Sequence, residues 1–285
     1  MLKFTKMHGI GNDYVFIYRD VDPPDSVLKN LTIKLSNRNF GIGSDGLILI
    51  SKSRVADFKM RIFNSDGSEG KMCGNGIRCV GKYVYENKLT RLSEITIETR
   101  GGIKKLYLSF DHEKEHVKDI RVNMGKVKLT DVCEFKAEDI TFKLNLVNCG
   151  NPHAVIFVEK DTMKYAKKYG ESISTSSLFP DGVNVEFIRI IDNKNIEVAV
   201  YERGSGITLA CGTGACASYF ISYKMGLVKK CGEVSLPGGK LKFSVKENDC
   251  VYMQGGAAKT FEGTFYDWFF RDMLFFWHIF SFLNS

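Results

Sequence analysis

The chain has 285 residues, of which 44% are hydrophobic, and it carries a formal net charge of +7. That length and apolar content suffice for a full hydrophobic core and for two domains of ordinary size. The basic residues are scattered along the chain rather than gathered in a stripe interleaved with aromatic residues. This pattern disfavours nucleic-acid binding and indicates an ordinary solvated surface.

Residues 1–20 contain no basic start followed by an apolar run, so we expect a cytoplasmic protein rather than a secreted one. The eight cysteines are then expected to be reduced. Cys73 and Cys79 are six positions apart, Cys211 and Cys216 are five apart, and neither pair has zinc-knuckle spacing. We therefore predict no metal site and interpret most of the cysteines as small buried hydrophobic residues.

The first half of the chain alternates short apolar segments with amphipathic ones. Apolar residues recur at helical spacing in residues 26–37, whereas they alternate with polar residues in 58–64. We expect strands at 2–7, 14–18, 47–50, 58–64, 95–99, 104–110 and 120–124, and helices at 26–37 and 77–85.

From Gly150 the same order of elements begins again. The segment MCGNGI at 72–77 is matched 138 positions later by ACGTGA at 210–215. We expect strands at 142–147, 154–158, 183–188, 197–201 and 234–236, and helices at 161–169 and 215–223. Agreement in both order and spacing argues for an internal duplication.

The duplication predicts an α+β fold of two homologous halves. Each half would form a mostly antiparallel sheet or barrel around a central helix, with the active-site cleft between the halves. We place the halves at residues 1–125 and 126–265, with the boundary near 119–131. Residues 266–285 form an aromatic-rich extension, whose apolar run at 273–283 is shorter than the ~20 residues that span a bilayer. We expect no stable membrane insertion.

Cys73 and Cys211 are each followed by a Gly-polar-Gly turn and then by a segment that can form a helix, which leaves the thiol at a helix N-terminus. The free N–H groups at a helix N-terminus lower the pKa of a thiol and bind carboxylates. Such a thiol can be a nucleophile, a redox centre or a proton carrier. A nucleophile with His8 or His153 as its base leaves the second cysteine unexplained, and a redox pair usually has CxxC spacing.

Proton transfer accounts for both cysteines. Inversion of a stereocentre that bears hydrogen needs a base on one face and an acid on the other, and a thiolate and a thiol differ by one proton. The helix-end amides would hold the carboxylate beside the reacting carbon and stabilise the carbanion. The repeated turn therefore favours a two-base stereoinversion.

Several longer motifs run in the order of one known family over about residues 1–265. They are MHGIGNDYVF (7–16), NRNFGIGSDG (37–46), RIFNSDGSEGKMCGNGIRC (61–79), GNPHAVIFV (150–158), FPDGVNVEF (179–187), VYERGSGITLACGTGACAS (200–218) and SLPGGKL (235–241). With these motifs the chain resembles the diaminopimelate epimerases, which interconvert LL- and meso-diaminopimelate. The resemblance implies no cofactor, no metal, an amino-acid substrate, a place in lysine and cell-wall precursor biosynthesis, and a homodimer.

The resemblance also implies roles for individual residues. In the LL-to-meso direction Cys211 would accept a proton and Cys73 would donate one, and His153 and Glu202 would complete the catalytic set. The backbone amides of Gly74, Asn75, Gly212 and Thr213 would bind the reacting carboxylate. The remaining substrate-binding positions are matched by Asn12, Asn64, Asn151, Asn184, Glu202 and Arg203.

The chemistry of these side chains suits a long diamino diacid. A guanidinium such as that of Arg203 pairs with a carboxylate through two parallel hydrogen bonds, and a carboxylate such as that of Glu202 pairs with an ammonium. The asparagines supply both donors and acceptors for the remaining charged groups. A substrate with two amino-acid ends would use all of them.

Two positions depart from the family pattern. Gly46 stands where many members carry glutamine, and Ile207 stands where the ERGxGET pattern has glutamate. These departures leave open an epimerase or racemase of the same fold that acts on another amino acid, such as histidine or lanthionine. A more distant alternative is a binding or redox protein that uses the cysteine pair without exchanging an α-hydrogen.

Overall fold

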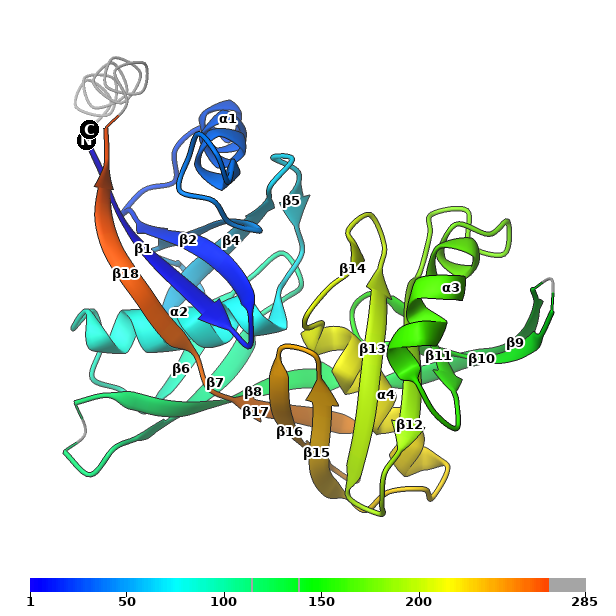
Figure 1. Ribbon diagram of the computed structural model, residues 1–285. Helices are drawn as coiled ribbons and strands as arrows, with labels where there is room; N and C mark the ends of the chain where they lie inside the picture. Colours follow the sequence, from blue (N-terminus) through cyan, green and yellow to red (C-terminus); the bar gives the residue numbers. More distant parts are fainter. Residues whose placement is uncertain (114, 138, 267–285) are drawn as a thin grey trace.

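The computed structural model describes residues 1–113, 115–137 and 139–266. Over these residues the chain forms eighteen strands and four helices, which gather into two lobes (Figure 1). The predicted α+β fold of two homologous halves is confirmed. The predicted aromatic extension lies outside the described residues, apart from Tyr266.

The first lobe surrounds helix α2 with strands that are mostly antiparallel. Its elements are β1 (Leu2–Gly9), β2 (Asn12–Tyr18), α1 (Asp25–Ser36), β3 (Gly46–Ser51), β4 (Phe58–Asn64), β5 (Glu69–Gly70), α2 (Gly74–Glu86), β6 (Glu94–Glu98), β7 (Lys104–Phe110) and β8 (Val117–Lys126). The pairs β2–β3 and β4–β6 are parallel. The pairs β1–β2, β3–β4, β6–β7 and β7–β8 are antiparallel.

The second lobe repeats this arrangement around helix α4. Its elements are β9 (Lys128–Lys136), β10 (Thr141–Asn148), β11 (Pro152–Phe157), α3 (Thr162–Ser174), β12 (Asn184–Ile190), β13 (Asn195–Glu202), β14 (Gly206–Ile207), α4 (Gly212–Lys224), β15 (Cys231–Leu236), β16 (Gly239–Val245) and β17 (Cys250–Gly255). Here β11–β12 and β13–β15 are the parallel pairs, as β2–β3 and β4–β6 are in the first lobe. The repeat in the sequence is thus a repeat of strand pairing.

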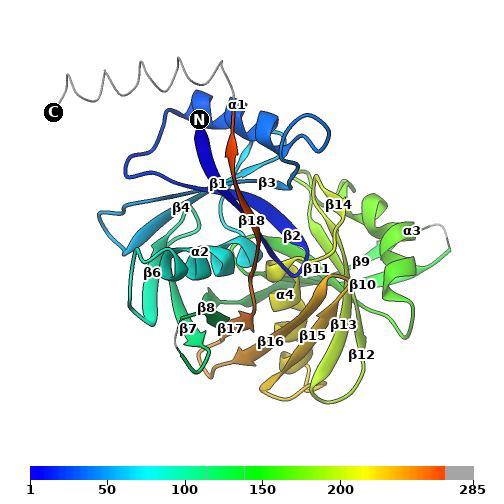
Figure 2. The same cartoon turned by 60° about the vertical axis from the view of Figure 1, so that its left-hand side comes forward.

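The two lobes exchange their last strands. Strand β18 (Ala258–Phe265) follows the second repeat but pairs antiparallel with β1 of the first lobe (Figure 2). In the same way β9 follows the first repeat and pairs with β10 of the second lobe. Strands β8 and β17 pair with each other and join the lobes. We placed residues 126–265 in one half, whereas the pairing puts residues 258–265 in the sheet of the first lobe.

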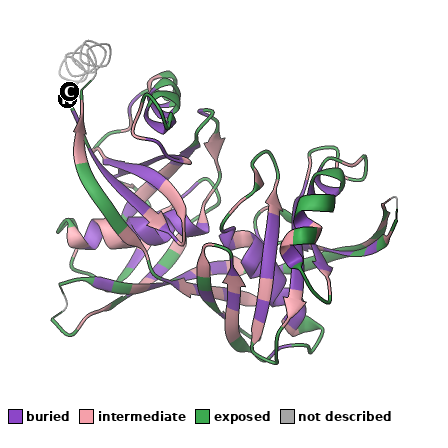
Figure 3. Ribbon diagram, in the orientation of Figure 1, coloured by how far each residue is buried: buried purple, intermediate pink, exposed green. Residues whose placement is uncertain are grey.

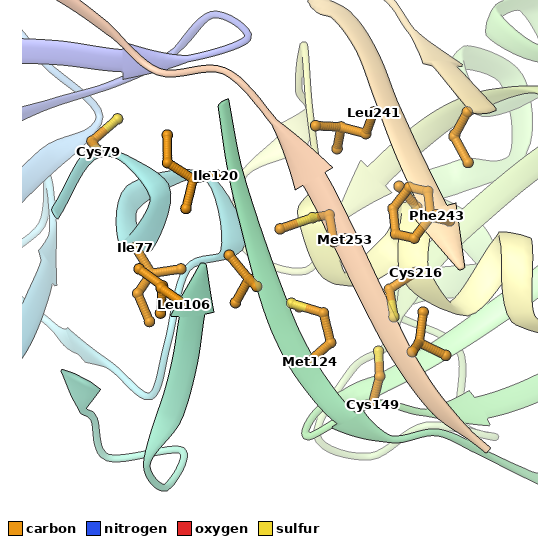
Figure 4. Close-up of a cluster of buried hydrophobic side chains, with 14 of the residues drawn as sticks. Ile77, Cys79, Leu106, Ile120, Met124, Cys149, Cys216, Leu241, Phe243 and Met253 are labelled. Atoms are coloured by element: carbon orange, nitrogen blue, oxygen red, sulfur yellow. The ribbon is translucent and has the colours of Figure 1, made fainter. Parts of the chain in front are cut away.

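The hydrophobic core is continuous between the lobes, because the buried face of β17 contributes to both. Met253 of β17 lies between the side chains around Ile77 and Ile120 and those around Cys216 and Phe243 (Figure 4). Burial is densest along α2, α4 and the strands around them (Figure 3). The two central helices are therefore held on a common support.

Both central helices begin earlier than the sequence predicted. We expected them to start at residues 77 and 215, but the structure begins α2 at Gly74 and α4 at Gly212. The reason is the cap: each preceding cysteine accepts a hydrogen bond from the backbone N–H three residues on, which satisfies a free donor of the first turn. Within the described part of the chain, no helix is long and apolar enough to cross a membrane.

Candidate active site

The N-termini of α2 and α4 meet where the two lobes join. A Cβ placed on Gly212 would lie 3.2 Å from the Cα of Gly74, so only glycine fits there without displacing the other helix. The two helix ends point their free N–H groups into the same region. A side-chain amide ties them together, since Asn75 Nδ2 donates to the Ala210 carbonyl over 3.1 Å.

The two predicted thiols occupy equivalent places at these helix ends. Cys73 Sγ accepts the Gly76 N–H over 3.3 Å, and Cys211 Sγ accepts the Gly214 N–H over 3.3 Å. An asparagine oxygen, Asn12 Oδ1, lies 3.3 Å from Cys73 Sγ. The symmetry that the repeat predicted is thus present at the level of single hydrogen bonds.

A cavity of about 630 Å³ opens between the two helix ends. Both thiols line it, together with most of the residues that the sequence singled out: Asn12, Asn64, Gly74, Asn75, Asn151, Glu202, Gly212 and Thr213. The backbone N–H groups of the first helical turns face an opening large enough for a small amino acid. Such groups are a ready site for a carboxylate.

Three predicted site residues do not line the cavity. Asn184 lies beside it, where its amide donates to the Pro152 carbonyl and accepts from the Arg203 N–H. The Arg203 side chain is exposed, and its guanidinium donates to the Asp181 carbonyl over 2.9 Å. His153 is buried behind the cavity wall. The substrate contacts expected of Asn184 and Arg203, and the catalytic role expected of His153, stay predictions.

The pKa of both thiols is raised in the free protein, not lowered as the helix-end position predicted. Burial raises the pKa of the Cys73 thiol, against the opposing hydrogen bond from Gly76. Burial raises the pKa of Cys211 well above its ordinary value, and the carboxylates of Glu202 and Glu186 raise it further. A helix end stabilises an anion only modestly, so loss of water around the sulfur outweighs it here.

Glu202 is the carboxylate that reaches the Cys211 side of the cavity. Burial raises the pKa of its carboxyl group, while hydrogen bonds from Thr208 and Cys211 act in the opposite direction. Thr208 Oγ1 donates to Glu202 Oε1 over 2.5 Å. The sequence analysis did not single out Thr208. Its position between Glu202 and Cys211, within the motif at 200–218, could have indicated it.

A charged cluster that the sequence did not single out forms the first-lobe rim of the cavity. Arg38 bridges Asp13 and Asp45, with distances of 3.1 Å and 2.9 Å to their carboxylate oxygens. Asn12 donates to Asp45 over 2.8 Å, so the cluster also orients an amide beside Cys73. Burial raises the pKa of Asp45, whereas Lys6 and Arg38 outweigh burial and lower the pKa of Asp13. Asn12, Asp13, Arg38 and Asp45 lie inside the motifs at 7–16 and 37–46.

A second missed residue, Glu186, lies behind the opposite wall. His153 Nδ1 is 2.6 Å from Glu186 Oε1, and both side chains are fully buried. Burial would lower the pKa of His153, but the adjacent carboxylate outweighs it and raises that pKa well above its usual range. His153 Nε2 reaches Asn151 Oδ1 over 3.1 Å, and Asn151 Nδ2 donates to Thr213 Oγ1 over 3.3 Å.

The sequence places this site in a known family. The family model described as diaminopimelate epimerase matches residues 4–130 and 145–260. Diaminopimelate epimerase of Methanococcus maripaludis is 44% identical over 279 residues, which cover 92% of this chain and 99% of the relative. That of Bacteroides thetaiotaomicron is 45% identical over 263 residues, covering 92% and 97%. The chain belongs to the diaminopimelate epimerase family.

The fold agrees with this membership in the diaminopimelate epimerase family. A crystal structure of a probable proline racemase from Agrobacterium radiobacter has the same fold, with a TM-score of 0.74. It covers 93% of each chain at 14% identity, so the likeness concerns the architecture alone.

The two departures from the family pattern now have a place in the structure. Ile207 lines the cavity and is 38% exposed, so it adds apolar surface to the rim. Gly46 pairs with Asn64 across β3 and β4, and a Cβ there would lie 2.0 Å from the Phe63 carbonyl oxygen. A side chain at position 46 would require β3 and β4 to move apart.

Proposed function

We propose that the protein is a cofactor-independent epimerase that interconverts LL- and meso-diaminopimelate by a two-base mechanism. One observation carries the proposal: two thiols at equivalent helix N-termini line one cavity between the lobes. Membership in the diaminopimelate epimerase family supports the choice of substrate. The proposal makes Cys73 and Cys211 the catalytic pair.

In this mechanism the two thiols begin with one proton between them. In the LL-to-meso direction the Cys211 thiolate removes the α-hydrogen, and the Cys73 thiol delivers a proton to the opposite face. The substrate leaves with inverted configuration, and the thiols have exchanged protonation states. The reverse reaction begins from that second state.

The carbanion between these steps needs stabilisation of its carboxylate. Backbone N–H groups of Gly74, Asn75, Gly212 and Thr213 border the cavity from both helix ends. Two helix N-termini directed at one carboxylate stabilise the negative charge that spreads onto it as the α-hydrogen leaves. The same groups would orient the α-carbon between the sulfurs.

The far end of the substrate is assigned to polar groups along the cavity. Asn64, Asn151 and Glu202 already line it. Asn184 and Arg203 lie beside it, and Arg203 would have to exchange its contact with the Asp181 carbonyl for the distal carboxylate. Closure of the lobes around the substrate would make that exchange possible and expel water.

The setting of the reaction is part of the proposal. Names of the relatives support a place in lysine and cell-wall precursor biosynthesis. We also propose that the protein acts in the cytoplasm and as a homodimer.

A second candidate is an epimerase or racemase of the same fold that acts on another amino acid. The observation that favours it is the altered cavity wall, with apolar Ile207 at the rim and no side chain at Gly46. Either change alters how a distal ammonium or carboxylate would be bound.

Hydrogen exchange separates these candidates. The reduced protein is incubated in deuterated water with LL-diaminopimelate or with a panel of single amino acids, and deuterium at the α-carbon is followed. Exchange with diaminopimelate supports the leading proposal, and exchange only with another amino acid supports the second. Absence of exchange with any substrate would exclude an epimerase.

Alanine variants test the two-base mechanism itself. Cys73→Ala and Cys211→Ala each remove one proton carrier, so each should abolish stereoinversion. Near wild-type rates of inversion in both variants would show the mechanism to be wrong. Cys231→Ala, at an exposed cysteine outside the cavity, provides the control.

A further inference from the structure

The two thiol sites match in their backbone but differ in what lies beneath the first helical turn. Beneath α2, a Cβ on Gly76 would lie 2.5 Å from Ile48 Cδ1. Beneath α4, a Cβ on Gly214 would lie 2.4 Å from Glu186 Oε1. Glu186 follows Ile48 by the same 138 positions that separate the two cysteines. An apolar side chain and a carboxylate therefore occupy equivalent places.

Glu186 brings negative charge close to the Cys211 end of the site. Its side chain is fully buried, and Oε1 contacts the His153 ring. The second oxygen, Oε2, has no hydrogen-bond partner among the described residues. A buried carboxylate oxygen without a partner is costly, so its retention against the first turn of α4 calls for a function.

The Cys73 side has a buried positive charge, where the Cys211 side has the buried carboxylate of Glu186. Arg78 of α2 is fully buried, and its guanidinium donates to Gly74 O and to Asn75 Oδ1, each over 3.0 Å. The equivalent position of α4 is Cys216, which has no cationic group. Positive charge thus lies under the turn that holds Cys73, and negative charge lies under the turn that holds Cys211.

We propose that Arg78 and Glu186 make the two thiols unequal, so that when the free protein loses one thiol proton the thiolate forms at Cys73 and the remaining proton stays on Cys211. Both are positioning residues, because they act through the thiols and neither lines the cavity. A nearby cation favours a thiolate, and a nearby carboxylate disfavours one. Since the proposal concerns which thiol holds the proton, it rests on the proposed two-base function.

The other groups around the two thiols also favour ionisation of Cys73 over ionisation of Cys211. Cys211 faces Glu202 of β13 and Glu186 of β12, with His153 of β11 on the far side of Glu186 and Cys149 next to His153. Burial is the largest cause that raises the pKa of Cys211 well above its ordinary value, and the two carboxylates add to it against the hydrogen bonds from Thr213 and Gly214.

The groups around Cys73 counteract the effect of burial on its pKa more strongly than the groups around Cys211 do. Its sulfur receives hydrogen bonds from the Gly76 and Asn75 backbone and from the Tyr14 hydroxyl, with Glu202 as an opposing carboxylate and Asp45 beyond Tyr14. Burial still raises the pKa of Cys73. No carboxylate adds to this effect from the place equivalent to that of Glu186, because Ile48 occupies it. The structure therefore favours ionisation of Cys73 first.

Alkylation of the free protein tests this order without turnover. Iodoacetamide reacts with thiolates, so the pH midpoint for each cysteine is read from the extent of alkylation of its peptide by mass spectrometry. In the wild-type protein Cys73 should have the lower midpoint. Glu186→Gln should lower the midpoint of Cys211 by about one pH unit and leave that of Cys73 nearly unchanged.

Matched variants keep the test specific. Ile48→Val changes the equivalent position under Cys73 without adding charge, and it should leave both midpoints where they are. Glu186→Asp keeps a carboxylate for His153 but withdraws it from Gly214, so it should lower the Cys211 midpoint by less than Glu186→Gln. If Glu186→Gln does not fold, Glu186→Asp alone decides the direction. Exposed Cys231 reports the reactivity of the reagent at each pH.

Two results would overturn the proposal. One is a lower midpoint for Cys211 than for Cys73 in the wild-type protein, and the other is a Cys211 midpoint that Glu186→Gln leaves unmoved. If Cys211 does not react at any pH, the ultraviolet absorbance of thiolates, titrated in Cys73→Ala and Cys211→Ala, decides the same order. None of these measurements depends on catalysis, so they can fail while the proposed function stands.

The pH profile of kcat/KM gives a readout that a structural role would not move. One thiol proton must remain on the pair, so the basic limb reports loss of that proton, which we assign to Cys211. Glu186→Gln should shift the basic limb down by about one pH unit and leave the acid limb in place. An unshifted basic limb would contradict the assignment.

Discussion

Gly74 and Gly212 face each other at the N-termini of two helices, so closely that a Cβ on Gly212 would lie 3.2 Å from the Cα of Gly74. Each helix end carries partial positive charge, so bringing two together is unfavourable unless an anion lies between them. A substrate carboxylate is such an anion. The close approach of these glycines therefore connects the duplicated fold to the binding of one carboxylate by both halves.

Gly212→Ala should separate the helix ends and lower activity more than stability. The added methyl group meets backbone of the other helix and Met253, so we expect a cost of about 1–3 kcal/mol in the free energy of unfolding. A misplacement near 1 Å at the thiols would lower kcat/KM by roughly 100-fold. Kinetics of α-hydrogen exchange and thermal unfolding measure the two effects. Gly256→Ala, where a Cβ has room, is the control.

Glu202→Gln should make the protein more stable at neutral pH and less active. Burial raises the pKa of Glu202, so the folded state binds the proton more tightly than the unfolded state. Its contribution to stability is present below the ordinary pKa of 4.5 and is lost as pH rises through the raised value. Glutamine removes that loss, so Tm should rise near pH 7–8, and the gain should disappear below pH 4.5.

Thermal unfolding over a pH series checks this sign. The exposed Glu247 gives the control, because Glu247→Gln removes a carboxylate from the protein surface. A lower Tm for Glu202→Gln throughout the neutral range would contradict the argument.

Gly46→Gln should destabilise the first lobe. The Cβ would lie 2.0 Å from the Phe63 carbonyl oxygen, where β3 pairs with β4, and strand separation at a packed site costs about 1–3 kcal/mol. Thermal unfolding should show a lower Tm, and the KM for diaminopimelate should not improve. Gly256→Gln introduces the same side chain where space is available. A variant with unchanged Tm and a lower KM would show that β3 accommodates the residue.

Much of this architecture could be predicted from residue patterns. The alternation in 58–64 coincides with β4, and the repeated turns brought Cys73 and Cys211 to one cavity. Local residue patterns determine single strands and helices. The constant separation of 138 positions then identifies which elements of the two halves are equivalent. The exchange of β18 into the first lobe was missed, because strand partners far apart in sequence leave no local signal.

The chemistry of the buried groups was harder to predict. Glu186 lies in the buried first part of β12, and nothing in the sequence indicates that it contacts His153. The raised thiol pKa values were also missed, because burial depends on the assembled lobes while the helix end is a local feature. The direction of the Arg203 side chain depends on a loop carbonyl that only the folded chain provides.

Oxidation should join Cys73 to Cys211 and inactivate the enzyme reversibly. Both thiols line the same cavity, and a disulfide there would occupy the place of the α-carbon. Attack requires a thiolate, and burial raises the pKa of both groups, so inactivation by diamide should be slow near pH 7 and faster as pH rises. Dithiothreitol should restore activity, and peptide mapping should identify the linked pair.

Comparison with single-cysteine variants isolates this disulfide from oxidation elsewhere. In Cys73→Ser the 73–211 bond cannot form, so diamide should not produce the linked peptide. Cys231→Ser and Cys250→Ser change cysteines that do not line the cavity, and both should be inactivated like the wild-type enzyme. Full activity in a preparation whose 73–211 disulfide is complete would mean that neither thiol transfers a proton to or from the α-carbon. The two-base mechanism would then be wrong.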